Sequence, residues 1–126
     1  MRTTDYAIKR IQSHLDEKEY ATALLLASIY VHMRLRSLLA DRLEEKGDDW
    51  GAIHKSLRID FVPAVRTCET LGLLRGQNPK NLTKLWDKRG SVAHESRLWR
   101  NPSEKDKEET KRLCMSAIDF LSMNRA

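Results

Sequence analysis

Hydrophobic residues recur at helical spacing along the whole chain, and no segment alternates between apolar and polar positions as a half-buried strand does. The first helix is predicted to begin near Thr4 or Asp5. Its apolar face comprises Ala7, Ile8, Ile11 and Leu15. A longer helix is predicted from about Glu19 to Lys46, where Gly47 provides a common C-terminal cap.

The long helix carries apolar residues on two faces. One face comprises Leu24, Ala27, Val31, Leu35, Leu38 and Leu39. The other comprises Ala23, Leu26, Tyr30 and Met33. At about 1.5 Å per residue this helix spans roughly 40 Å. Because a helix that is apolar on two sides has to cover both, we expect it to pack within the fold and against a second subunit.

Two helices are predicted in the middle of the chain. A short one through Trp50 and Ile53 follows two capping aspartates. The next begins near Asp60, has Pro63 in its first turn and ends at Gly72. Its apolar positions are Phe61, Val65, Cys68 and Leu71.

Local start signals define two further helices. Asn78 followed by Pro79 is a strong N-terminal signal for the first. The stretch from Glu95 to Pro102 is predicted to be a loop, after which Ser103 and Asp106 resemble a capping box. The apolar positions of the last helix are Leu113, Cys114, Ala117, Ile118 and Leu121.

Length and composition agree with this helical pattern. A chain of 126 residues is long enough for one domain with a single core. We therefore predict one all-α domain over residues 1–126, an up-and-down bundle of about five helices around one long central helix. The net charge of +5 is compatible with a polyanionic partner, although 18 acidic residues are mixed with the basic ones.

Several classes of site have no sequence signal. Cys68 and Cys114 form no Cys-x-x-Cys pair and have no zinc-binding spacing, so we expect buried, reduced thiols. The chain has no glycine-rich phosphate loop and no HExxH motif, and we predict neither a metal nor a cofactor. Without a signal-peptide pattern or an apolar run of membrane-spanning length, we expect a cytoplasmic protein with no membrane partner.

Arg89 occupies a position where the helical pattern requires a hydrophobic residue. On a wheel that advances about 100° per residue, its neighbours within about 60° are Leu82, Leu85, Trp86, Val92 and Ala93. Arginine is rarely buried without a partner. The helix therefore directs a guanidinium into an interface or presents its apolar face to an anion. The alternative is a structural ion pair with Asp87, Glu95 or a carboxylate of the long helix.

His94 lies five residues after Arg89 and is either an acid–base group or the cap of a helix terminus. Weaker candidates for nucleic-acid contacts are the nearby cations Lys88, Arg97 and Arg100. Trp99 lies between two of these cations, where its indole is suited to stacking on a base or to packing on the bundle.

These segments together resemble the HEPN superfamily, the higher eukaryotes and prokaryotes nucleotide-binding domains. The region from Glu19 to Leu39 resembles the long second helix of the family, and Phe61 to Leu74 resembles the helix before the motif. The run NLTKLWDKRGSVAH is similar to the helix with the Arg-x4-His motif, and ETKRLCMSAIDFL to the closing helix.

The resemblance implies a helical bundle that forms a homodimer and places two motifs in one cleft. Many members cleave RNA without a metal, and toxins of the family are silenced by an antitoxin protein. By this analogy Arg89 holds the phosphate and His94 moves protons, leaving 2′,3′-cyclic phosphate and 5′-hydroxyl ends. We therefore expect a metal-independent endoribonuclease of the defence or toxin–antitoxin type, with RNA as its substrate.

Two departures from the family favour an alternative, a non-catalytic HEPN module that binds nucleic acid, a nucleotide or a protein. Gly90 follows the arginine where active members often carry a polar residue, and the long helix has His32 in the region where an acidic residue is frequent. Residues five apart on a helix also point about 140° from each other. Arg89 and His94 of one chain therefore converge only if the helix breaks or a second subunit contributes.

Overall fold

The computed structural model describes residues 3–47, 55, 58–74, 78–94 and 97–124, with the side chains of residues 3, 93, 94, 97 and 98 excepted. These residues form helices and contain no strand, which confirms the all-α prediction. The helices are α1 (Thr3–Asp16), α2 (Tyr20–Glu45), α4 (Phe61–Thr70), α5 (Pro79–His94), α6 (Arg97–Arg100) and α7 (Glu104–Met123).

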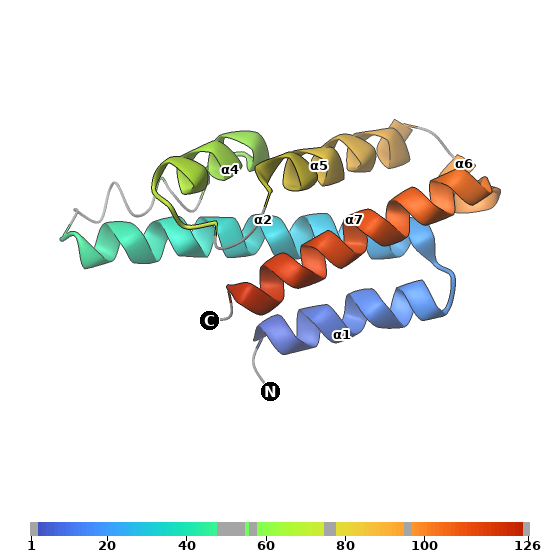
Figure 1. Ribbon diagram of the computed structural model, residues 1–126, viewed down its shortest axis with the longest axis horizontal. Helices are drawn as coiled ribbons and strands as arrows, with labels where there is room; N and C mark the ends of the chain where they lie inside the picture. The colour runs from blue at the N-terminus through green and yellow to red at the C-terminus, as the bar shows by residue number, and fades with distance from the viewer. Residues whose placement is uncertain (1–2, 48–54, 56–57, 75–77, 95–96, 125–126) are drawn as a thin grey trace.

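The long helix α2 is the centre of the bundle, and each of the other described helices packs against it (Figure 1). Helices α1 and α7 also pack against each other, as do α4 and α5. Helix α5 contacts α7 as well, so the two pairs close around α2. The short helix α6 lies against α2 and α5. This arrangement places the predicted motif helix beside both the central helix and the closing helix.

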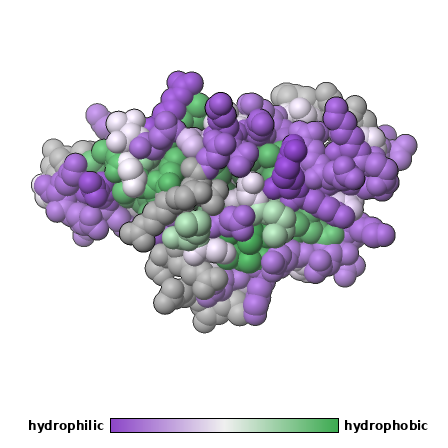
Figure 2. All heavy atoms as spheres, viewed as in Figure 1, coloured by the Kyte–Doolittle hydropathy of each residue, from purple (hydrophilic) through white to green (hydrophobic). Residues whose placement is uncertain are grey.

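The predicted apolar faces form the core. Ala7, Ile8 and Ile11 of α1 are buried, and so are the interior positions Leu24, Ala27, Val31, Leu35 and Leu39 of α2. Helix α7 adds Phe120 to its predicted face, and this ring is fully buried. Figure 2 shows the complementary pattern, with hydrophilic residues over much of one face of the molecule and hydrophobic residues between them.

The helix boundaries follow the predicted local signals. The Oδ1 atom of Asn78 accepts a hydrogen bond from the backbone N–H of Lys80 at 3.0 Å. Ser103 and Asp106 form the predicted capping box at the start of α7. Gly47 and Gly72 adopt φ values of +74° and +70°, in the left-handed region where glycine is favoured. These contacts are local in sequence, and for that reason the sequence alone identifies them.

The predicted loop from Glu95 to Pro102 is wrong in part, because Arg97–Arg100 forms the single helical turn α6. The indole Nε1 of Trp99 donates a hydrogen bond to the carbonyl of Val92 at 3.3 Å and ties this turn to the end of α5. The predicted short helix through Trp50 and Ile53 lies outside the described residues.

Cys68 and Cys114 are free, buried thiols, as predicted. Burial raises the pKa of Cys68 to about 11 and that of Cys114 to about 12. The Sγ atom of Cys68 also donates to the carbonyl of Leu35 at 3.7 Å. Because the thiolate is the reactive form, both cysteines are chemically inert near neutral pH.

Helix α2 is more apolar than the sequence analysis expected. It is the one described helix that meets the length and composition of a membrane span, with a mean hydropathy of 1.3 over its most apolar window. That result corrects the statement that no apolar run approaches this length. Buried core positions supply part of this hydropathy, as they do in central helices of bundles. The rest lies on the outer side of α2, where Ile29 is 51% exposed and Met33 is 52% exposed.

Candidate functional site

The face of α5 that carries Arg89 is buried, as its pattern predicts. Leu82, Leu85 and Val92 are at most 3% exposed, whereas Arg89 is partly exposed. The guanidinium carbon of Arg89 lies 4.4 Å from the centroid of the Trp86 ring. This cation–π contact explains how the helix accommodates a charge at the edge of its apolar face. It leaves the guanidinium N–H groups available on the open side.

No carboxylate pairs with Arg89 among the residues that the structure describes. The alternative of a structural ion pair with Asp87 or with an acidic residue of α2 is therefore not found in this part of the chain. Glu95, the third acid considered, lies outside the described residues. An arginine that contacts an indole and has no anionic partner is suited to binding an anion from outside the chain.

Trp86 is held in place by a cluster of rings from three helices. Its ring stacks on Phe61 of α4, with centroids 4.8 Å apart and planes 11° from parallel. The imidazole of His32 on α2 meets Trp86 edge-on at 5.9 Å and Phe61 at 5.5 Å. Because Phe61 is fully buried, the cluster fixes the indole on which Arg89 rests.

His32 packs against the two aromatic rings and is bonded to a backbone carbonyl. Its Nε2 donates a hydrogen bond to the carbonyl of Ile59 at 2.8 Å, because a carbonyl oxygen only accepts. Arg36 Nε donates to the same oxygen at 3.0 Å. Burial lowers the pKa of His32, and the positive charges of Arg36 and Arg89 act in the same direction, against the hydrogen bond to Ile59 and the negative charge of Asp60. The imidazole of His32 is thus mainly neutral near pH 7, within reach of the charges of Arg36, Asp60 and Arg89.

His94 is the last residue of α5, and its side chain lies outside the description. Since α5 is helical from Pro79 to His94, the directions of Arg89 and His94 from the helix axis differ by about 140°. The continuous helix thus contains no break that would change this angle between the two backbone positions.

The three weaker candidates are in different environments. The Nζ atom of Lys88 lies 3.3 Å from Asp106 and 3.8 Å from Glu109, so α7 neutralises its charge. Arg100 is exposed and lines a surface pocket. The side chain of Arg97 lies outside the description. Arg100 is therefore more accessible to a ligand than Lys88, which has a structural role.

Asp106 explains why Lys88 is held so firmly. Burial opposes charge on this carboxyl, but hydrogen bonds from Ser103 and the neighbouring Lys88 ammonium outweigh it and lower the pKa to about 2. The same carboxylate completes the capping box of α7. One side chain thus joins α5 to the start of α7.

Sequence reasoning missed Arg36 and the role of Trp86 as a platform. Helical periodicity places both residues on their own helices, but it carries no information on which side of α2 faces α5. The nearest signal is the spacing of His32 and Arg36, which are four residues apart and therefore neighbours on α2. The site consequently contains two guanidinium groups near His32 rather than the single one that the sequence indicates.

No group of three or more His, Cys, Asp or Glu side chains that could hold a metal ion occurs within the described ranges. Comparisons of this chain with protein families, with characterised proteins and with solved structures find no match. The resemblance to HEPN domains therefore rests on the residues of the chain itself.

Proposed function

We propose that this protein is a metal-independent endoribonuclease of the HEPN type, in which Arg89 and His94 act across the cleft of a homodimer. The observation that carries the proposal is the environment of Arg89. Its guanidinium rests on Trp86 at 4.4 Å, at the edge of a buried helix face, and has no carboxylate partner among the described residues. Such a group is positioned to bind a phosphate, which accepts two N–H bonds from one guanidinium.

Arg36 strengthens this environment. Its Nε is occupied by the carbonyl of Ile59, and its positive charge lies near His32 together with that of Arg89. Two fixed cations stabilise the charge that develops on phosphorus oxygens when a phosphodiester is attacked. The neutral imidazole of His32 adds no third charge and keeps its position through the hydrogen bond to Ile59. The proposal gives His32 a positioning role.

The chemistry assigns separate tasks to the two motif residues. The 2′-hydroxyl of the RNA attacks the adjacent phosphorus, so that the 2′-oxygen–phosphorus bond forms and the bond to the 5′-oxygen breaks. In each of the two composite sites one His94 accepts the 2′-hydroxyl proton, and the imidazolium so formed returns a proton to the departing 5′-oxygen. Arg89 stabilises the phosphorane charge. The products are a 2′,3′-cyclic phosphate and a 5′-hydroxyl.

The outer side of α2 supports the homodimer. Ile29 and Met33 are each about half exposed, and Leu25 and Leu26 beside them are only partly buried. Ile29 lies within about 60° of Arg36 around the helix, on the side of α2 that faces the ring cluster. Ile29 and Arg36 are about 10 Å apart along α2, so a second copy that covers Ile29 and extends along this face reaches the side of the bundle that carries Arg89. This is the position from which a partner subunit supplies the missing half of the site.

A non-catalytic module that binds RNA is the second candidate. Gly90 beside Arg89, and a neutral His32 in place of an acidic residue on α2, favour it. Both candidates use the same two guanidinium groups to hold phosphate. They differ in whether bound RNA is cut.

Cleavage of a labelled, structured RNA in EDTA tests the proposal. The wild-type protein is compared with Arg89→Ala and His94→Ala, and with Arg112→Ala as a matched control, since Arg112 is exposed on α7. We expect both motif variants to lose at least about 100-fold in rate, whereas the wild type and the control both produce cyclic-phosphate ends. Circular dichroism and sedimentation are used to check that each variant keeps its fold and oligomeric state. RNA that binds but remains intact with the wild type would establish the binding module instead.

A further inference from the structure

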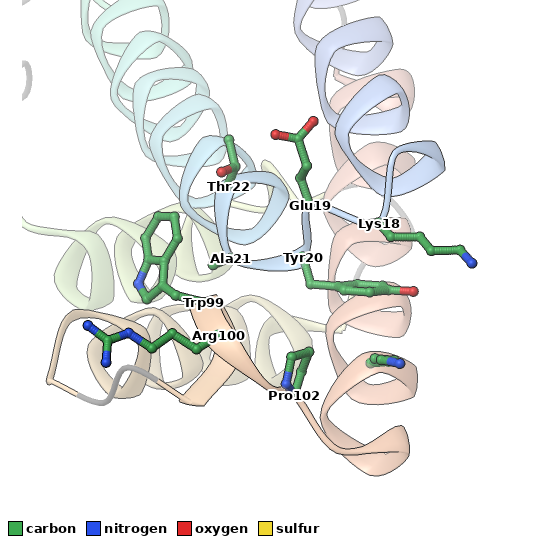
Figure 3. A pocket seen from close by; sticks show the side chains of 9 residues that line it. Lys18, Glu19, Tyr20, Ala21, Thr22, Trp99, Arg100 and Pro102 are labelled. Atoms are coloured by element: carbon green, nitrogen blue, oxygen red, sulfur yellow. The ribbon is translucent and has the colours of Figure 1, made fainter.

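A surface pocket of about 270 Å³ lies where α6 meets the beginning of α2. The first turn of α2, with Tyr20 and Ala21, forms one wall, and Trp99, Arg100 and Pro102 form the other (Figure 3). This pocket is separate from the ring cluster around Trp86. It nevertheless adjoins the C-terminal end of α5, because the indole of Trp99 is bonded to the Val92 carbonyl, two residues before His94.

Trp99 is both anchored and accessible. Its Nε1 donates to the Val92 carbonyl at 3.3 Å, which fixes the plane of the ring. At the same time 51% of the residue remains exposed, although tryptophan is among the side chains that gain most from burial. A fixed indole with an open face is the platform on which proteins stack the bases of single-stranded nucleic acids.

Cations lie at both ends of this pocket. Figure 3 shows Arg100 beside Trp99 at one end and Lys18 at the other end, with Tyr20 between Trp99 and Lys18. Lys107 also lines the pocket, but Glu104 pairs with it at 3.1 Å. Glu19 is the acidic residue in the lining, and it contacts His14 at 3.3 Å. Arg100 and Lys18 therefore remain to contact a ligand.

We infer that this pocket is a subsite for single-stranded RNA, in which one base stacks on Trp99, a neighbouring phosphate contacts Arg100, and the strand runs along the pocket to Lys18 at its other end. The inference rests on the proposed function, since a strand held here continues toward the end of α5 that carries His94. The subsite explains why α6 forms a helical turn in a segment expected to be a loop: the turn presents the indole at a fixed place. It assigns substrate recognition to residues outside the Arg-x4-His motif.

Binding is measured separately from cleavage with a fluorescein-labelled 2′-O-methyl octanucleotide, which has no free 2′-hydroxyl and cannot be cut by the proposed route. Fluorescence anisotropy gives its affinity for the wild type, Trp99→Leu, Trp99→Phe and the control Tyr6→Leu. Tyr6 is an equally exposed aromatic residue on α1, at 52%. We expect about tenfold weaker binding for Trp99→Leu, most of the affinity retained by Trp99→Phe, and no change for Tyr6→Leu.

Two further arms identify the ligand. Arg100→Gln lowers the slope of log affinity against log salt by about 0.7, the value for one contact to a single strand. AMP competes much more weakly than the octanucleotide, because it offers one phosphate. AMP that binds as tightly as the strand would overturn the assignment to RNA.

Equal losses in Trp99→Leu and Trp99→Phe, unchanged binding in Trp99→Leu, or no binding by the wild type would each overturn the subsite. The same proteins are assayed for cleavage of unmodified RNA. Cleavage that proceeds without any dependence on Trp99 would overturn the subsite alone. Trp99-dependent binding without cleavage would support the subsite and reject the nuclease.

Discussion

Arg89 carries a charge at the edge of an apolar helix face, where the indole of Trp86 accommodates it. Helical periodicity places it correctly among Leu82, Leu85 and Val92, because all of these belong to one helix. The periodicity does not reveal that the indole of Trp86 accepts the cation, or that Arg36 lies nearby on α2. Those contacts depend on how helices pack, and a single sequence contains no direct record of that. The residue was therefore predictable, and its surroundings were not.

Asp106 gives the protein a defined sensitivity to acid. Its pKa is lowered from 3.8 to about 2 in the folded protein, so the charged carboxylate stabilises the fold above about pH 4. We expect that contribution to disappear progressively as the pH falls from about 4 to about 2. Urea unfolding at a series of pH values measures it. Asp106→Asn should flatten this acid limb, whereas Asp119→Asn, at an exposed position of the same helix, should leave it unchanged.

At the scale of the helix, boundaries were predictable wherever a local signal marks them. Asn78, the Ser103 capping box and the left-handed glycines all act within a few residues of chain. Helix α6 was missed because its four residues are too few for a periodic pattern and its anchor is a bond from Trp99 to the preceding helix. Helix α5 is continuous through Gly90, which keeps the backbone positions of Arg89 and His94 on different sides of the helix.

Gly90→Ala should stabilise the protein by about 0.5–1 kcal/mol, because Gly90 is inside α5 and an added Cβ meets nothing within 4 Å. Gly72→Ala, at a φ of +70°, should instead cost about 1 kcal/mol. Chemical denaturation of the three proteins measures both changes. We also expect Gly90→Ala to keep the proposed ribonuclease activity, since a composite site needs no break in α5. A variant that is more stable but inactive would mean that the helix opens at Gly90 to join Arg89 and His94.

At the scale of the whole molecule, the all-α bundle around one long helix was predictable from length and pattern alone. The outer face of α2 was also visible in the sequence, where Met33 belongs to a second apolar stripe. Ala23, another member of that stripe, is buried within the chain. The apolar surface of α2 that remains exposed is therefore smaller than the stripe predicts. The remaining exposed face is narrower and centres on Ile29 and Met33.

Met33→Glu should shift the proposed dimer toward the monomer, because a carboxylate is costly to bury in an apolar interface. Analytical ultracentrifugation over a range of concentrations measures the change, which we expect to be at least tenfold in the dissociation constant. Met115→Glu is the matched control, since Met115 is 45% exposed on α7. A monomeric wild type would contradict the proposed dimer itself. Equal effects of the two substitutions would mean that α2 is not part of the interface.

The most direct test of the account is to mix Arg89→Ala with His94→Ala after unfolding and refolding them together. Each variant alone is expected to be inactive. If Arg89 and His94 act from different subunits, half of the refolded dimers contain one intact site out of two, and the mixture should regain about a quarter of the wild-type cleavage rate. A mixture that stays as inactive as its two components, with mixed dimers shown to be present, would contradict a site shared between subunits.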